Sequence, residues 1–219
     1  MKTQDELKLM YIRRFSGKEE YRRKVWSILV SDWFQRYIPD AGAVLDLGCG
    51  HGEFINNLKG LIRYAMDLNP DSGRHLDAEI RWFQQDCSKQ WPLPDNALDL
   101  VFTSNFFEHL PHKTNLLATL IEAHRCIRPG GRLIALGPNI KYVGGAYWDF
   151  WDHHLPLTEA SLVEALQTAG FKLERVVPRF LPYSMSEGPR YPLFFLRLYL
   201  RLPLAWRFFG RQFLIVAYK

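Results

Sequence analysis

Three glycines spaced two residues apart, Gly48, Gly50 and Gly52, are the most specific chemical signal in the sequence. Residues 43–47 before them are mainly apolar, which is typical of a buried parallel strand. Glycine adopts positive φ angles and has no Cβ, so a ligand can approach the backbone closely. Residues 53–58 can begin a helix, and the first N–H groups of a helix are free to bind a ligand. We therefore expect a strand–loop–helix unit that binds a nucleotide cofactor.

The spacing of these glycines separates two classes of cofactor. The dinucleotide fingerprint G-x-G-x-x-G would require its last glycine at Glu53 or Ile55, so it does not fit. The pattern D-x-G-x-G-x-G, from Asp46 to Gly52, instead resembles the first motif of class I S-adenosylmethionine-dependent methyltransferases of the small-molecule type. A carboxylate at the strand end suits the ammonium group of a methionine moiety and would repel a pyrophosphate. A glycine-rich turn without a ligand is the alternative. The resemblance implies cofactor contacts from Asp46, Gly48, Cys49, Gly50 and Gly52.

Two further acidic residues follow predicted strands. Asp67 ends the predicted strand 61–66, where a carboxylate can accept both hydroxyls of a ribose, and we expect Leu68 beside it to contact the cofactor. The alternative for Asp67 is capping of the next turn. In the family that the sequence resembles, an aspartate after the third strand accepts a hydrogen bond from the adenine amino group. Asp86 matches it by position, and Cys87 would lie beside the ring. An ordinary turn aspartate is an equally good interpretation of Asp86.

The predicted strand 98–104 carries a polar stretch to the sheet edge where ligands bind in open α/β sheets. Residues 104–110, S-x-x-x-E-H-L, resemble the fourth motif of the same family, whose backbone lies along the methionine part of the cofactor. The resemblance implies cofactor contacts from Ser104, Asn105 and His109. Glu108 and His109 suggest an acid and a base, but in the family this pair is more often structural. We therefore place His109 near the site without a catalytic role.

Residues 140–157 form a long aromatic connection, and loops at a rigid sheet edge are where function concentrates. Aromatic walls suit an apolar or planar acceptor and also a sulfonium cation. The tripeptide Asp152-His153-His154 offers an imidazole beside a carboxylate, so His153 or His154 is the candidate base for a hydroxyl acceptor. The alternative is that the rings fill core and the histidines cap the next helix. The predicted acceptor-binding residues, the first two in an N-terminal lid, are Tyr11, Phe15, Phe106, Tyr142, Tyr147, Trp148 and Trp151.

Hydrophobic periodicity predicts the elements that must position these residues. We expect helices over 18–38, 115–127 and 159–169, and strands over 43–47, 61–66, 80–83, 98–104, 133–136, 171–177 and 212–219. The family resemblance covers residues 40–139. It implies an α/β, Rossmann-like three-layer sandwich, with a seven-stranded, mostly parallel sheet and an antiparallel last strand. The expected organisation is one domain, 1–219, with a helical cap (1–40), a cofactor-binding core (41–139) and a substrate side (140–219) that includes a helical insertion (178–211).

Composition limits the other functions. A length of 219 residues suits one domain with a substantial core. The net charge of +5 is spread along the chain, and the Asn/Asp-Pro-Pro-Tyr/Phe tetrapeptide of base-methylating enzymes is absent, which argues against a nucleic-acid acceptor. The three cysteines lack metal-ligand spacing, so we expect no metal site and a reduced, cytoplasmic protein. Neither a signal peptide nor a membrane-spanning segment is expected.

Residues 191–209 are apolar apart from polar tyrosine hydroxyls and three arginines. Arg197 and Arg201 are four residues apart and would share a helical face, and Pro203 should break the helix. This composition is that of an interfacial helix, which would give a peripheral membrane contact. The alternative, which we favour from the sequence, is a buried cover over the acceptor pocket, because a helix that is apolar nearly all round is usually buried.

These observations predict methyl transfer from S-adenosylmethionine to a small, hydrophobic or lipid- or sugar-linked acceptor, at oxygen. If the acceptor is a carbon or an amine, a base is not required. Methylation at nitrogen or carbon, a nucleic-acid acceptor, and a non-catalytic binding protein with the same fold are the alternatives.

Overall fold

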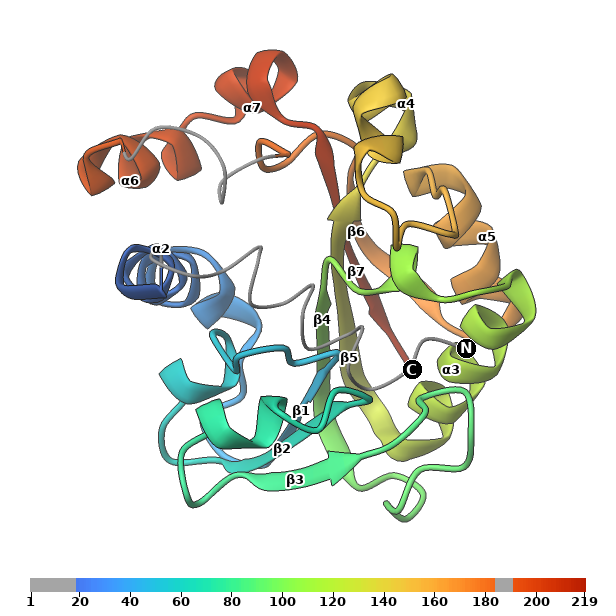
Figure 1. Ribbon diagram of the computed structural model, residues 1–219. Helices are drawn as coiled ribbons and strands as arrows, with labels where there is room; N and C mark the ends of the chain where they lie inside the picture. The colour runs from blue at the N-terminus through green and yellow to red at the C-terminus, as the bar shows by residue number, and fades with distance from the viewer. Residues whose placement is uncertain (1–18, 184–190) are drawn as a thin grey trace.

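The computed structural model describes residues 19–183 and 191–219, which form a seven-stranded sheet flanked by helices (Figure 1). The strand order is β3-β2-β1-β4-β5-β7-β6. All neighbouring pairs are parallel except those of β7, which is antiparallel to β5 and β6. The predicted fold class is therefore confirmed. The strands are β1 (Ala43–Leu47), β2 (Ile62–Asp67), β3 (Arg81–Gln84), β4 (Leu98–Ser104), β5 (Ile127–Pro138), β6 (Lys172–Val177) and β7 (Gln212–Tyr218).

The helices lie on both faces of the sheet, as a three-layer sandwich requires. Figure 1 shows α2 on one side and α3 and α5 on the other, while α6 and α7 lie at one end on the α2 side. The α5 helix begins where predicted, because Thr158 and Ser161 form a reciprocal capping box. The described helices are α2 (Glu19–Asp32), α3 (Lys113–Cys126), α4 (Ile140–Val143), α5 (Glu159–Thr168), α6 (Leu193–Arg201) and α7 (Pro203–Phe209).

The strand order determines where a ligand can bind. The chain leaves β1 toward β2 on one side, and β4 lies on the other side of β1. At such a switch point the loops after neighbouring strands diverge and leave a crevice at the carboxyl edge of the sheet. Of the four predicted cofactor segments, those that follow β1, β2 and β4 therefore meet at this edge, and the fourth follows β3, the strand beside β2.

Three predicted elements differ from the structure. The helix expected over 18–38 ends at Asp32 and is followed by a 3₁₀ helix, Phe34–Tyr37. The helix expected over 53–58 is reduced to a 3₁₀ turn, Ile55–Asn57, because the Asn56 side chain bonds the backbone of His75 and Asp77 and competes with continued helix formation. The third difference is β5, which begins at Ile127, directly after α3, instead of at residue 133.

The segment 191–209 forms two helices that separate at Pro203, as predicted. It is not the buried cover that the sequence favoured. The buried residues are Leu200 in α6 and Trp206 in α7, whereas most of the other large apolar side chains are exposed. Both buried residues pack beneath the helices, and Trp206 lies edge-on against Trp33 at 5.0 Å.

Some expectations concern the ends and the organisation of the chain. Tyr11 and Phe15, the predicted lid residues, lie outside the described residues. The division into cap, core and substrate side stays a prediction. Within residues 19–183 and 191–219, no helix combines the length and apolar character that crossing a membrane requires.

Candidate active site

The glycine-rich loop after β1 is held by both neighbouring strands. Gly48 has a φ of 69°, and a Cβ at this position would lie 2.2 Å from the Phe106 ring, so only glycine fits. The N–H groups of Gly48 and Cys49 both donate to the Met66 carbonyl, at 2.8 and 3.2 Å. Phe106, a predicted acceptor-binding residue, therefore packs directly on the loop.

Asp46 lies beneath this loop in a buried position. Burial, with the charges of Glu53 and Asp67, holds the pKa of the Asp46 carboxyl well above its usual range, although a hydrogen bond from the Ile55 backbone opposes the shift. Asp46 therefore stabilises the turn after the glycines. Its predicted contact with a cofactor ammonium group stays a prediction.

Asp67 joins the end of β2 to the glycine-rich loop. One carboxylate oxygen accepts the N–H of Gly50 and the other accepts the N–H of Asn69, each at 2.9 Å. Burial raises the pKa of this carboxyl, while these N–H groups act in the opposite direction. A carboxylate has about four acceptor sites, so Asp67 can still accept ribose hydroxyls. The neighbouring Leu68 side chain is 50% exposed and offers an apolar surface beside them.

Asp86 and Cys87 lie at the turn after β3. One Asp86 oxygen accepts hydrogen bonds from the backbone and the hydroxyl of Ser88, at 2.9 and 2.7 Å, as expected of a turn aspartate. The Cys87 thiol is buried, it accepts a hydrogen bond from Thr119 at 3.2 Å, and burial raises its pKa to about 12. The thiol therefore faces the α3 side of the core. A contact between these residues and an adenine ring stays a prediction.

The chain after β4 makes a tight turn toward the site. Ser104 ends the strand, and Asn105 has a φ of 49°, which asparagine tolerates better than most residues. The Asn105 N–H donates to the Leu136 carbonyl of β5 at 2.8 Å. The short 3₁₀ helix Phe107–His109 follows and presents Glu108 and His109 at the carboxyl edge.

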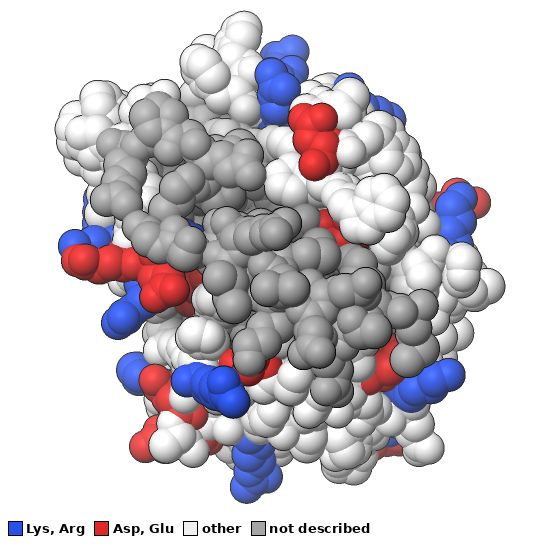
Figure 2. Space-filling view, viewed as in Figure 1, with Lys and Arg blue, Asp and Glu red and all other residues white. Residues whose placement is uncertain are grey.

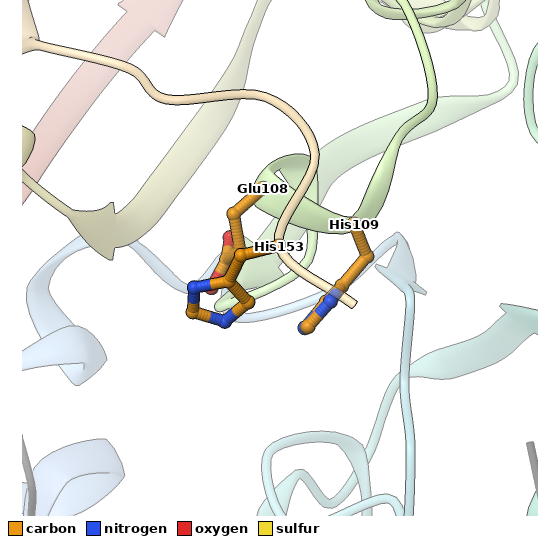
Figure 3. Close-up of side chains that lie close together, drawn as sticks. All are labelled: Glu108, His109 and His153. Carbon is orange, nitrogen blue, oxygen red and sulfur yellow. The ribbon is translucent and has the colours of Figure 1, made fainter. Parts of the chain in front are cut away.

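Glu108, His109 and His153 come together in space (Figure 3). Each offers a donor atom, and these atoms all lie within 4.8 Å of one another. The segment that carries His153 is attached to the 3₁₀ helix, because the N–H groups of His154 and Leu155 both donate to the Glu108 carbonyl, at 2.8 and 3.0 Å. Two stretches separated by more than forty residues therefore form one cluster.

The hydrogen bonds of the two imidazoles determine which nitrogen is basic. Nδ1 of His109 lies 3.1 Å from the Asp152 carbonyl and 3.2 Å from its carboxylate. Nδ1 of His153 lies 3.0 Å from the Tyr147 carbonyl. Because these partners are acceptors, each Nδ1 must carry the hydrogen, and the neutral rings can accept a proton only at Nε2.

The environment of His109 favours its charged form. Burial lowers the pKa of His109, but the hydrogen bond to Asp152 and the charge of Glu108 outweigh this effect and leave the pKa raised. The His109 side chain is 28% exposed, whereas His153 is buried and stacks on Phe150 at 4.9 Å. His154, the other candidate base, has an exposed position.

The predicted acceptor aromatics divide into two groups. Tyr147 is fully buried, contacts His153 at 4.6 Å, and its hydroxyl has no hydrogen-bond partner among the described residues. Burial raises the pKa of this phenol above its usual range. Trp148 and Trp151 are exposed, and Tyr142 lies away from the cluster, on α4 beneath Arg179. Among the described residues of this set, Tyr147 contacts His153 and Phe106 packs on the glycine-rich loop, while Trp148 lies against Tyr147 at 5.0 Å.

Asp152 makes a contact that the sequence did not predict. The tripeptide suggested an imidazole beside a carboxylate, and the structure also places the Asp152 carboxylate on Nδ1 of His109. The tripeptide was the only feature of the sequence that pointed to Asp152, because its contact with His109 joins two loops that are far apart in the chain.

The polar and apolar groups at this sheet edge fit S-adenosylmethionine. Asp46 and Asp67 provide carboxylates at the ends of neighbouring strands, and Leu68 provides an exposed apolar surface next to Asp67. The cluster of Glu108, His109 and His153 has donor atoms close enough to hold a small cation, and each imidazole already directs Nδ1 to a protein acceptor. The same arrangement also suits proton transfer.

Comparison with known proteins agrees with this geometry. Residues 45–135 match the family described as a methyltransferase domain. The chain contains a class I S-adenosylmethionine-dependent methyltransferase domain. S-adenosylmethionine is accordingly the cofactor of this domain, and the predicted family is confirmed.

Several curated proteins are similar over part of their length. A probable S-adenosylmethionine-dependent methyltransferase from Mycolicibacterium smegmatis is 29% identical over 150 residues, which are 66% of this chain and 57% of that protein. A malonyl-[acyl-carrier protein] O-methyltransferase from Dechloromonas aromatica is 33% identical over 60% of this chain and 52% of its own. A ubiquinone/menaquinone biosynthesis C-methyltransferase from Dinoroseobacter shibae is 30% identical over 52% and 48%. The chain thus spans about half the length of the curated relatives it matches.

Solved structures share the fold of the methyltransferase chain over nearly its whole length. A SAM-dependent methyltransferase from Archaeoglobus fulgidus has a TM-score of 0.70 at 20% identity and covers 96% of this chain and 99% of its own. A putative methyltransferase of Haloferax volcanii, in complex with the Trm112 methyltransferase activator, also has a TM-score of 0.70, at 18% identity, over 99% of this chain and 97% of its own.

Proposed function

We propose that the protein transfers a methyl group to a small, hydrophobic or lipid- or sugar-linked acceptor, at a hydroxyl oxygen. The observation that carries this proposal is the pair of imidazoles whose Nε2 atoms are the basic nitrogens, at the sheet edge beside the glycine-rich loop. When bound, S-adenosylmethionine supplies a methyl group that is already activated as a sulfonium. What remains for the protein is to orient the acceptor and take its proton, and orientation alone can lower the barrier by about 7–11 kcal/mol.

The proposed base is Nε2 of His153 or His109. His153 was the candidate from the sequence, and the hydrogen bond to the Tyr147 carbonyl supports it by directing Nε2 away from that carbonyl. His109 is a second candidate base, because Asp152 orients its ring and stabilises the imidazolium that forms when the ring accepts a proton. His154 has weaker support, because its side chain is exposed and its N–H holds the backbone.

Label transfer from S-adenosylmethionine to a panel of hydroxyl acceptors tests the proposal. We expect His153→Gln and His109→Gln to lower turnover by roughly 10²–10⁴-fold. In His153→Gln the S-adenosylhomocysteine affinity, measured by calorimetry, should stay unchanged, whereas His109→Gln should also weaken it if His109 contacts the cofactor. His154→Gln is the matched control and should retain turnover. Wild-type turnover in both His109→Gln and His153→Gln would exclude the imidazole base and favour methylation at nitrogen or carbon.

Cofactor binding is tested separately. S-adenosylhomocysteine should bind and NAD should not. Asp67→Ala should weaken S-adenosylhomocysteine binding by about 1–3 kcal/mol, because charge-assisted hydrogen bonds to the ribose are lost. Asp95→Ala, at an exposed carboxylate paired with Arg125, is the control. Binding of S-adenosylhomocysteine without transfer to any acceptor would favour the non-catalytic alternative.

The relatives' names support both oxygen and carbon acceptors, so the choice of oxygen rests on the imidazoles. A lipid-linked acceptor would come from a membrane, and we propose that residues 191–209 make the peripheral membrane contact. A cytoplasmic location is part of the same proposal.

A further inference from the structure

The helices α6 and α7 expose an unusually large apolar surface. Each of its large side chains is at least 46% exposed, and surfaces of this kind on monomeric proteins usually bind a partner or a membrane. We call this set the α6–α7 surface, and its residues are Tyr191, Phe194, Phe195, Leu198, Leu202, Leu204, Phe208 and Phe209.

The charged side chains carried by the last part of the chain have one sign. Residues 191–219 contain arginines and one lysine but neither aspartate nor glutamate. Arg197 is 51% exposed and forms an ion pair with Asp32 of α2, at 2.7 Å, so its charge is already balanced within the protein. Arg201 and Arg207 are exposed. In Figure 2, the described atoms at the end of the molecule where Figure 1 places α7 are mainly uncharged, with basic and acidic side chains beside them.

A pocket of about 500 Å³ adjoins this surface and combines cations with apolar walls. Leu204, Arg207 and Phe208 share one face of α7, and Tyr142 and Arg179 form the opposite wall. The Arg179 guanidinium is held by the carbonyls of Phe208 and Gly210, both at 2.9 Å, and lies 4.7 Å from the Tyr142 ring. The pocket therefore combines the hydrogen-bonded guanidinium of Arg179 and the exposed guanidinium of Arg207 with apolar side chains, which matches an anionic headgroup attached to acyl chains.

We propose that the α6–α7 surface docks the protein on anionic lipid membranes, and that the pocket between α7 and α4 binds a lipid phosphate. An interfacial element needs an apolar face that enters the acyl boundary and basic residues that meet the headgroups, and α6 and α7 provide both. The proposal deepens, and rests on, the membrane contact proposed above. It is tested by binding alone, so its failure is distinguishable from a failure of methyl transfer.

Vesicle flotation of the full chain tests the docking. We expect the protein to float with vesicles that contain phosphatidylglycerol in phosphatidylcholine, at low salt, and to remain below with phosphatidylcholine alone. Arg207→Gln should reduce the membrane partition constant, measured by varying the lipid concentration, by about fivefold, the equivalent of roughly 1 kcal/mol for one basic residue at an anionic surface. Phe208→Ser should also reduce binding, because an apolar anchor is lost.

Matched variants separate the surface from general effects of charge and hydrophobicity. Arg81→Gln, on β3, removes the same charge at the opposite part of the sheet, and Ile121→Ser removes a side chain that is 50% exposed on α3. Neither should change flotation. Thermal unfolding and S-adenosylhomocysteine calorimetry on the same samples show that each variant is folded.

Three outcomes would overturn the proposal. The first is no flotation at any lipid composition, and the second is equal loss of binding in the Arg81→Gln control. The third is concentration-dependent dimerisation in light scattering without vesicle binding, which would assign the surface to a second copy of the chain. Titration with short-chain phosphatidic acid and with inorganic phosphate tests the pocket. We expect the lipid to bind more tightly, and equal affinities would assign a free-anion site instead.

Discussion

The Nδ1 atom of His109 faces two oxygens of Asp152, one from the backbone and one from the carboxylate. This contact fixes the ring and raises the pKa of the imidazole against the effect of burial. A base must be neutral to accept a proton, so the rate should increase as pH rises through this pKa.

We predict that Asp152→Asn moves the acidic limb of the pH–rate profile to lower pH. The substitution removes the negative charge that raises the pKa of His109, and so more of the ring is neutral at a given acidic pH. The profile of kcat/KM is the measurement. Asp149→Asn, at an exposed position in the same connection, is the control and should leave the limb in place. A limb that does not move would show that His109 is not the titrating group.

Two buried aspartates on neighbouring strands should respond in opposite ways to substitution. The pKa of Asp46 is raised by burial, so folding must remove a charge from water at any pH above the unfolded value. The contribution of Asp46 to the free energy of unfolding therefore falls as the pH rises from the pKa of the unfolded state through the pKa of the folded state. Asp99 instead accepts the Ala43 N–H at 2.8 Å and forms an ion pair with Arg128.

We expect Asp46→Asn to raise the melting temperature at neutral pH, by about 2–4 °C for each 1 kcal/mol gained, because the amide keeps an acceptor for the Ile55 N–H without the buried charge. Asp99→Ala should instead cost about 1–3 kcal/mol. If Asp46 binds the cofactor's ammonium group, Asp46→Asn will also weaken S-adenosylhomocysteine binding. A lower melting temperature for Asp46→Asn at neutral pH would contradict the assignment of its pKa.

At the scale of elements, α7 is anchored by one buried aromatic side chain, Trp206. Trp206 is buried against Trp33 and Phe180, with ring centroids at 5.0 and 5.1 Å, and its indole N–H donates to the Tyr199 carbonyl at 2.8 Å. By contrast, the ion pair between Arg197 and Asp32 that joins α6 to α2 is partly exposed.

Trp206→Ala should therefore lower the free energy of unfolding by about 3–5 kcal/mol, as loss of a buried aromatic side chain usually does. Arg197→Gln, the comparison variant, should lower it by less than about 1 kcal/mol, because exposed pairs gain little over water. Urea denaturation measures both. Equal effects would mean that electrostatic contact, not packing, holds the two helices.

Helices and strands were predicted correctly where a local sequence pattern determines them. The strand over 98–104 and the capped start of α5 depend on hydrophobic alternation and on Thr158, and both match the structure. The helix after the glycine-rich loop failed because a distant contact, from Asn56 to the chain near His75, competes with it. The exposure of α6 and α7 could not be predicted from composition, because a segment rich in apolar residues can be either buried in the core or exposed at a binding surface.

At the scale of the molecule, positive charge is dispersed, and several of the described arginines and lysines form ion pairs. Arg63, for example, contacts both Asp77 and Glu79, and Arg125 contacts Asp95 and Glu122. A nucleic-acid site requires a continuous basic groove, because each phosphate contact releases a counterion. We predict that fluorescence anisotropy with labelled RNA or duplex DNA will show only weak binding that disappears at about 200 mM salt. Micromolar affinity at that salt would restore a nucleic-acid acceptor as a candidate.

The local geometry around the glycine-rich loop was predictable from the sequence, and the contacts between the loops after β4 and β5 were not. The glycines, Asp46 and Asp67 lie within single loops or strand ends, so their spacing along the chain determines how they are arranged. Residues 150–155 fold back on the 3₁₀ helix after β4, and sequence adjacency could not reveal the resulting contact between Asp152 and His109.

The connection between β6 and β7 is long, although these two strands are antiparallel neighbours that a tight hairpin could join. Phe180 and Trp206, both carried by this connection, pack on Trp33 of the N-terminal helical region. Shortening the connection to a hairpin would uncover that tryptophan. We therefore expect relatives that lack this segment to have a different side chain in place of Trp33, and a chimera that receives the segment will need a compatible partner at that position.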